Sequence, residues 1–72
     1  MTDAERLTSI GEALYGRTWQ AQIASLLDVD PRRVRQWLSG DRPIPVGAWP
    51  ELRAELRLRG KSALALADRL TV

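Results

Sequence analysis

The chain has 72 residues, of which 44% are hydrophobic and 28% are charged, so we expect one small folded domain and not a disordered segment. It contains no cysteine and no histidine, which removes a disulfide framework, the usual ligands of zinc and the commonest catalytic bases. No apolar run approaches the roughly 20 residues of a membrane span, and the N-terminus is acidic where a secretory signal would be basic. These features predict a cytosolic protein that is not an enzyme and binds neither a metal nor a cofactor.

The net charge of +2 is unevenly distributed along the chain. Residues 1–30 carry two arginines and five acids, a net charge of −3, whereas residues 31–72 carry nine lysines and arginines and four acids, a net charge of +5. A concentrated basic segment is typical of proteins that bind polyanions. Almost all of these cations are arginines, whose planar guanidinium suits phosphates and guanine edges, although a GC-rich genome also favours arginine codons.

Capping residues predict the first two helices. Thr2 and Glu5 have the spacing of a capping box, and an apolar stripe follows them, so we expect a helix over residues 3–15. Thr18 is expected to cap a second helix over residues 19–27. The N-terminal part of the chain is therefore predicted to be helical throughout.

A short turn and a third helix follow. Asp28 tolerates the left-handed conformation that such a turn needs. Asp30 and Pro31 combine a favoured N-cap with the residue favoured at the first helical position, and Gly40 is placed to end the helix. This predicts a helix over residues 31–38, separated from the preceding one by about three residues.

The C-terminal part is predicted to hold two more helices. Pro50 either begins the first of them or kinks a helix that started near Pro45, and Gly60 interrupts the pattern before Lys61 opens the last helix. We therefore expect an all-α fold, a compact five-helix bundle. Residues 1–60 would form a helix-turn-helix domain, and residues 61–72 a C-terminal helix available for dimerisation.

One face of the third helix is predicted to carry the function. Val34 and Trp37 have the spacing of a buried face, which turns the neighbouring polar side chains toward solvent. Those side chains are Arg32, Arg33, Arg35 and Gln36. An ordinary solvated face would mix charges of both signs, whereas this one has three arginines and no acid. The tryptophans Trp19, Trp37 and Trp49 are interpreted mainly as core residues and not as a platform for stacking bases.

Residues 20–40, followed by Asp41-Arg42-Pro43, resemble the helix-turn-helix of the lambdoid phage repressor and Cro superfamily. The resemblance extends over roughly residues 7–58. The matching positions are Gln20, Ala24, Trp37 and Gly40. The chain departs from the family pattern at Asp28, where glycine is usual, and at Pro31, where a base-contacting polar residue is common.

The resemblance implies a role for each matched residue. Arg32 and Gln36 would read bases in the major groove, and Arg33 and Arg35 would reach either a base edge or the adjacent backbone. Phosphates would be bound by Gln20 and Arg42, with Thr18 and Arg17 as weaker candidates.

The implied function is that of a small transcriptional regulator of double-stranded DNA. Such proteins often act as dimeric autorepressors of phage or bacterial operons, including those encoded beside anti-CRISPR genes, and a dimer would bind a palindromic operator. Candidate dimer contacts are Leu64, Leu66 and Leu70, for which packing within the monomer is the alternative. A helical protein-binding module, such as an antitoxin or inhibitor that reuses the fold, is the second hypothesis. An enzyme built on Asp28, Asp30 and Asp41 is disfavoured, because no nucleophile or ligand cluster accompanies these acids.

Overall fold

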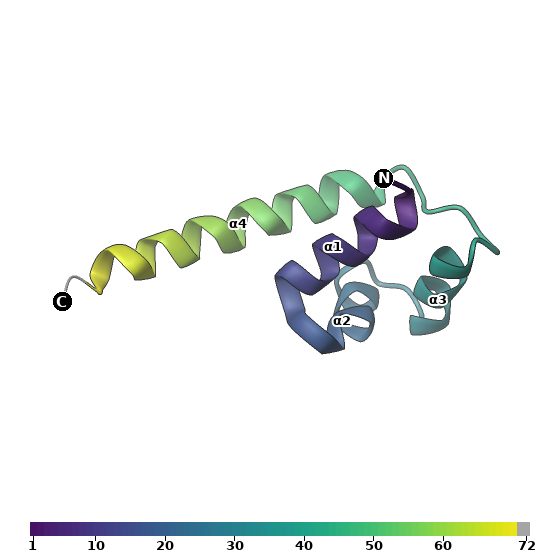
Figure 1. The fold of residues 1–72 in the computed structure, drawn as a ribbon, viewed down its shortest axis with the longest axis horizontal. Coiled ribbons are helices and arrows are strands. Elements are labelled where there is room, and N and C mark those ends of the chain that lie inside the picture. Colours follow the sequence, from purple (N-terminus) through teal and green to yellow (C-terminus); the bar gives the residue numbers. More distant parts are fainter. Residues whose placement is uncertain (71–72) are drawn as a thin grey trace.

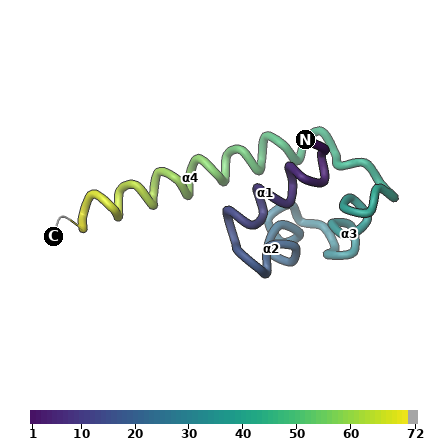
Figure 2. The backbone as a smooth tube through the Cα atoms, in the orientation of Figure 1, coloured from purple at the N-terminus to yellow at the C-terminus, as the bar shows by residue number. Residues whose placement is uncertain are grey.

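The computed structural model describes residues 1–70, which form a helical domain with one long helix projecting from it (Figure 1). These residues contain four α-helices, one short 3-10 helix and no strand. In chain order the elements are α1 (Asp3–Tyr15), η1 (Gly16–Thr18), α2 (Trp19–Leu26), α3 (Pro31–Ser39) and α4 (Ala48–Arg69). Helix α1 contacts each of the other three α-helices, and Figure 1 shows it between α4 on one side and α2 and α3 on the other. The tube in Figure 2 shows the loop from α3 returning past the N-terminus before α4 begins.

The prediction of a compact five-helix bundle is wrong, because the last two predicted helices are one continuous helix, α4. Pro50 is the third residue of α4, where its missing N–H would have had no partner in the helix, so it neither delays nor kinks the helix. Gly60 keeps its N–H and costs a helix only about 1 kcal/mol relative to alanine. The surrounding residues are good helix formers, and Arg59 Nε donates a hydrogen bond of 2.8 Å to Glu55 Oε1 one turn earlier. A helix separate from α4 therefore does not begin at Lys61.

The projecting part of α4 makes the molecule elongated. Its principal extents are 49 × 25 × 22 Å, and its radius of gyration is 13.8 Å. A compact domain of this length would have a radius of gyration of roughly 11 Å. Over the described residues, no helix combines the length and the apolar character that crossing a membrane requires. Residues 71 and 72, which belong to the predicted C-terminal segment, lie outside the described part of the chain.

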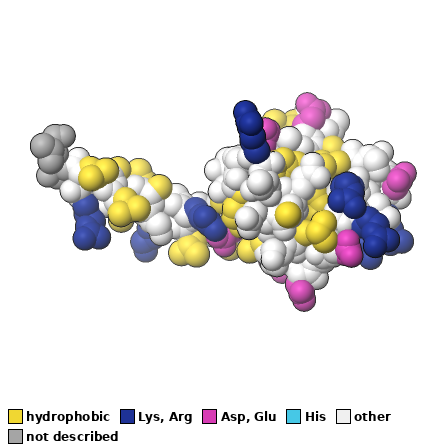
Figure 3. All heavy atoms as spheres, turned by 90° about the horizontal axis from the view of Figure 1, so that it is seen from below, with side chains coloured by type: hydrophobic (Ala, Val, Ile, Leu, Met, Phe, Trp, Pro, Cys, Tyr) yellow, Lys and Arg dark blue, Asp and Glu magenta, His cyan; other side chains and the backbone are white. Residues whose placement is uncertain are grey.

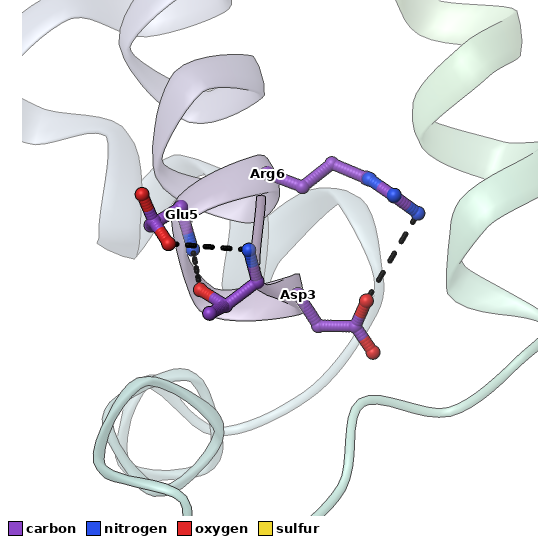
Figure 4. A network of polar contacts seen from close by, with 4 residues as sticks. Asp3, Glu5 and Arg6 are labelled. Carbon is purple, nitrogen blue, oxygen red and sulfur yellow. Dashed lines mark hydrogen bonds and ion pairs between the residues drawn. The ribbon is translucent and has the colours of Figure 1, made fainter.

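The predicted capping box at the start of α1 is confirmed (Figure 4). The Glu5 backbone N–H donates to Thr2 Oγ1 at 3.1 Å, and the Thr2 backbone N–H donates to Glu5 Oε1 at 3.1 Å. The hydrogen bond from the Thr2 backbone N–H lowers the pKa of the Glu5 carboxyl, and the Thr2 side chain lowers that pKa further. Arg6 lies 3.9 Å from Asp3 in the same turn, an exposed ion pair that adds little stability. The local sequence therefore determines where the chain becomes helical.

The entry into α2 differs from the prediction. Thr18 precedes Trp19 as expected, but it belongs to η1 and its side chain makes no capping hydrogen bond. Its backbone angles, φ −94° and ψ 21°, are not the extended ones of a capping residue. Gly16 relieves the sharp bend after α1 with φ +69° and ψ −139°, a combination available to glycine and outside the left-handed helical region. Thr18 is therefore not a helix cap.

The core lies where α1, α2, α3 and the first turns of α4 meet. The buried hydrophobic residues are Leu7, Trp19, Ile23, Ala24, Val34, Trp37, Ile44, Ala48 and Leu52. Trp19 and Trp37 are buried as predicted, whereas Trp49 is only partly buried and packs against the edge of the core. The guanidinium of Arg6 lies 5.6 Å from the centre of the Trp49 ring, a cation–π distance. The interpretation of the tryptophans as core residues holds fully for two of the three.

A close approach between α1 and α2 depends on Gly11, which sequence analysis did not single out. Gly11 is buried within α1, and the ring of Trp19 packs against its backbone. A Cβ atom added at Gly11 would come within 2.1 Å of Trp19 Cε3. The absence of a side chain at this position therefore allows the large aromatic ring to sit directly on the backbone of α1.

Candidate nucleic-acid interface

The turn between α2 and α3 holds the two helices close together. Asp28 adopts a positive φ of 56°, the left-handed conformation expected for it. The N–H of Val29 then donates to the carbonyl of Ala24 at 2.9 Å, which satisfies a group at the end of α2. Ala24 is 1% exposed at the crossing of the helices, and Val29 packs against the core. The predicted helix, short turn and helix are confirmed, with α2 ending one residue earlier than expected.

The start of α3 is fixed by the predicted Asp30-Pro31 pair. The Arg32 backbone N–H donates to Asp30 Oδ1 at 2.8 Å, and Pro31 occupies the first helical position. Gly40 ends the helix in the left-handed conformation, with φ +86°. Helix α3 runs one residue past the predicted end at Leu38, to Ser39.

The buried side of α3 determines which side chains face solvent. Val34 is 0% and Trp37 4% exposed, so the helix is anchored at the two predicted positions. Arg32, Arg33 and Arg35 are consequently exposed, and Gln36 is partly exposed. Within α3 no acid accompanies these arginines. The predicted polar face of the helix is therefore present at the surface.

Arg42 joins this face because the loop after α3 folds back onto the helix. Its backbone N–H donates to the carbonyl of Gln36 at 3.3 Å. An open depression results, and its lining residues are Asp30, Arg32, Arg33, Gln36 and Arg42. Figure 3 shows lysine and arginine side chains gathered at the end of the molecule that α3 forms. The structure thus brings four of the predicted DNA-contacting residues into one basic surface, hereafter the basic depression.

Four other predicted contacts lie away from the basic depression. Arg35 is exposed on α3 but does not line it. Thr18 and Gln20 lie at the entry to α2, Thr18 exposed and Gln20 partly buried, and Arg17 is exposed in η1. Gln20 occupies the first turn of α2, where backbone N–H groups have no partner within the helix. Phosphate contacts from this end of α2 stay a prediction, and they would be made separately from those of Arg42.

The sequence analysis interpreted Asp30 as a cap and disfavoured it as an enzyme's carboxylate, and its side chain also lines the basic depression. Its Oδ1 lies 4.0 Å from Arg32 Nε in an exposed pair. This second position was predictable, because an N-cap is adjacent to the first turn of its helix and Arg32 is in that turn. A carboxylate here opposes an approaching phosphate, whereas its exposed pair with Arg32 adds little stability. Asp30 is therefore the one acid among the residues that line the basic depression.

Asp30→Asn should strengthen DNA binding without a large effect on folding. Asparagine caps helices about as well as aspartate, so the free energy of unfolding should change by less than about 0.5 kcal/mol. Loss of the negative charge should increase affinity for all duplexes at low salt and steepen the dependence of log K on log salt by about one unit. Both quantities can be followed by fluorescence anisotropy with a labelled duplex over a salt series.

Asp30→Ala is the matched control, because it removes the same charge together with the cap. It should lower the free energy of unfolding by about 0.5 to 2 kcal/mol and still bind DNA more tightly than the parent chain at temperatures where it is folded. If Asp30→Asn bound no more tightly than the parent at low salt, the carboxylate would not face the DNA.

The three candidate dimer leucines lie on the projecting part of α4. Leu64, Leu66 and Leu70 are 69%, 59% and 79% exposed, so none packs within the described part of the monomer. Leu66 and Leu70 are four residues apart and share a face, whereas Leu64 lies on a different side of the helix. The three leucines therefore do not form one surface.

Comparison of the chain with protein-family models, with curated proteins and with solved structures gave no match. The class of protein is thus defined by the structure itself: a helical domain that presents the short, arginine-rich helix α3 beside Arg42 of the following loop.

Proposed function

We propose that this chain is a sequence-specific double-stranded DNA-binding protein that regulates transcription, with α3 entering the major groove. The observation that carries the proposal is the basic depression, in which Arg32, Arg33 and Gln36 of α3 lie beside Arg42 of the following loop. An α-helix with its side chains is about 10 to 12 Å wide, which suits a major groove about 12 Å wide. The resemblance of residues 20–43 to the repressor and Cro helix-turn-helix supports the same assignment.

The side chains divide into those that select a sequence and those that hold the duplex. Arg32 is suited to the O6 and N7 atoms of guanine, and Gln36 to the N6 and N7 atoms of adenine. Arg42 binds a phosphate next to these bases, because its backbone is tied to the end of α3. Arg33 and Arg35 lie on α3 beside Arg32 and Gln36 and contact either bases or the adjacent backbone. Thr18 and Gln20 bind a second phosphate at the start of α2.

The proposal includes two copies of the chain on a palindromic site. Helix α3 has nine residues, and a single helix of that length contacts too few base pairs to select one site in a genome. Leu66 and Leu70, which share one exposed face of α4, supply an apolar surface for association of two copies. A dimer of this kind would act as an autorepressor of a phage or bacterial operon.

The division of roles predicts two classes of mutant. Arg32→Ala and Gln36→Ala should each relax preference at one or two base pairs and cost about 1 to 3 kcal/mol on the preferred site. Arg42→Ala and Gln20→Ala should weaken binding to all sequences alike; Arg42→Ala should also reduce the salt slope by about one unit, whereas Gln20→Ala, which removes no charge, should leave the slope unchanged. Competition binding against a panel of single-base variants of the selected site separates the two classes.

The same measurement can refute the assignment. If Arg32→Ala and Gln36→Ala both left affinity and base preference unchanged, α3 would not be the helix that reads DNA. A uniform loss from every variant, with no change in preference, would instead describe a protein that binds only the phosphate backbone.

A further inference from the structure

An open groove runs along one side of α4, where the proposed function places no contact. Its lining residues all belong to this one helix: Trp49, Pro50, Arg53, Ala54 and Arg57. Trp49 is partly buried, and the other four are exposed. A small molecule usually buries most of its surface in a pocket, which the side of a single helix does not provide. This surface, hereafter the α4 groove, therefore suits a segment of a larger partner.

The α4 groove combines positive charge with apolar surface. Arg53 and Arg57 supply the charge, and none of the five lining residues is an acid. Neither arginine forms an ion pair within residues 1–70, the part of the chain that the structure describes. The apolar part is formed by the side chains of Trp49, Pro50 and Ala54. A partner that covers the whole groove has to supply both carboxylates and apolar groups.

The two arginines begin a row of cations that continues outward along α4. The row, hereafter the basic row, consists of Arg53, Arg57 and Lys61. All three are exposed. Their spacing of four residues places them on one side of the helix, with roughly 5 to 6 Å between successive Cβ atoms. The positive charge of this side is therefore regularly spaced, one cation in each turn.

The remaining charges of this part of α4 do not interrupt the basic row. Glu51, Glu55 and Arg69 lie on other sides of the helix. Arg59 also lies away from the row and donates a hydrogen bond of 2.8 Å to Glu55. Asp68 is on the same side as the row, but about two turns beyond its last member. The charges of the helix are thus segregated around its axis, and the groove is on the basic side.

We infer that the α4 groove and the basic row bind an acidic amphipathic helix of a partner protein. Carboxylates at four-residue spacing on that helix match the cations of the row turn for turn. Apolar side chains beside those carboxylates cover Trp49 and Pro50, and the small side chain of Ala54 lets the two helices approach closely. The inference adds a protein partner to the chain and does not rest on the proposed DNA binding.

A nucleic acid is the other polyanion that such cations attract, but the groove favours a protein. Bases bind aromatic side chains by stacking on a free ring face. The ring of Trp49 packs against the core, and the guanidinium of Arg6 lies over it, 5.6 Å from its centre. Arg6 itself lies 3.9 Å from Asp3, so it adds little net charge. The side chains of Pro50 and Ala54 offer a phosphate no hydrogen-bond donor.

The α4 groove is separate from the basic depression of α3. No lining residue is common to the two. Figure 1 shows α1 between α4 on one side and α3 on the other. Each surface can therefore be changed without altering the side chains of the other.

The test uses a defined probe and the full chain. The probe is a fluorescently labelled synthetic helical peptide with glutamate at every fourth position and leucines beside the glutamates. One control peptide has glutamine in place of glutamate, and a second has serine in place of leucine. Fluorescence anisotropy should show binding of the probe at low salt, and each control should bind at least about tenfold more weakly, because it lacks the charges or the apolar contacts.

Two double variants of equal charge change assign the surface that binds the probe. Arg53→Glu combined with Arg57→Glu should weaken probe binding at least about tenfold, because each change places like charges opposite each other. Arg32→Glu combined with Arg33→Glu should leave probe binding within about twofold at moderate salt, since that site is remote. A labelled DNA duplex should show the reverse order of losses. Circular dichroism checks that both variants keep the helix content of the parent.

Three results would overturn the inference: no binding of the probe, equal binding of the peptide that lacks leucine, or equal losses of probe binding from the two double variants. A duplex that the variant of Arg53 and Arg57 fails to bind, and that the variant of Arg32 and Arg33 still binds, would assign the α4 groove to nucleic acid instead. Absence of DNA binding by the parent chain would refute the proposed function and leave the peptide measurements intact.

Discussion

Gly11→Ala should lower the free energy of unfolding by about 1 to 3 kcal/mol, although alanine is the better helix former. The added methyl would come within 2.1 Å of Trp19 Cε3 and within 2.4 Å of Cδ2, distances at which the ring must move. Trp19 is 6% exposed and surrounded by core residues, so it cannot move without displacing them. For a domain of this size, each kcal/mol corresponds to a fall in Tm of roughly 4 to 8 °C. Thermal and urea unfolding followed by circular dichroism measure both quantities.

Gly60→Ala is the matched control, because it makes the same substitution in another helix. A Cβ at Gly60 would meet no atom within 4 Å. The change should therefore stabilise the chain by about 0.5 to 1 kcal/mol through helix propensity alone, to the extent that the outer half of α4 unfolds together with the domain. If Gly11→Ala were as stabilising as Gly60→Ala, the packing of Trp19 against α1 would be wrong.

Replacing Arg32 and Arg33 together by glutamate should weaken binding to the preferred DNA site by at least about 100-fold at moderate salt. Each change removes a cation from the basic depression and places an anion where the duplex approaches. Both side chains are exposed, and glutamate is favourable in the first turn of a helix, so the fold should be retained. Fluorescence anisotropy gives the affinity, and circular dichroism checks the helix content.

The matched control for this pair is the double replacement of Arg53 and Arg57 by glutamate. These arginines are exposed on α4 away from α3, and the variant changes the net charge of the chain by the same amount. It should lower DNA affinity only through long-range electrostatics, an effect that salt screens within a Debye length of about 10 Å at 0.1 M. Equal losses from the two double variants would show that binding depends on total charge and not on the basic depression.

Local signals predicted the part of the fold that carries the site. Asp30, Pro31 and Gly40 determine the start and the end of α3 through hydrogen bonds and backbone angles within the segment. The spacing of Val34 and Trp37 predicted the buried side of α3. It thereby also predicted the polar face that the helix presents to solvent. These features depend on residues within a turn or two of each other, which is why the sequence alone was sufficient.

Features that depend on contacts distant in sequence were missed. Nothing near Gly11 indicates that Trp19 will pack on it, because the contact exists only once α2 folds back on α1. The number of helices was wrong because Gly60 weakens a helix without breaking it, and the flanking residues of α4 sustain it.

The predicted site was likewise incomplete where loops determine it. Arg42 was expected to bind a phosphate from its place in the motif, but its position beside Gln36 depends on the hydrogen bond that folds the loop back. Asp30 was interpreted as a cap, and its presence in the basic depression follows from the same short turn that makes it a cap. A prediction from residue types alone therefore found the cations and overlooked the acid among them.

Selection of the purified chain against a random duplex library, with the affinity of the selected DNA followed over a salt series, tests most directly whether α3 reads double-stranded DNA. We expect enrichment of a palindrome whose half-sites are about 10 to 11 base pairs apart, or a multiple of that distance, with affinity falling steeply as salt increases. Failure to enrich any sequence, with weak salt-sensitive binding or none, would contradict the account and favour a protein partner for the surface of α3.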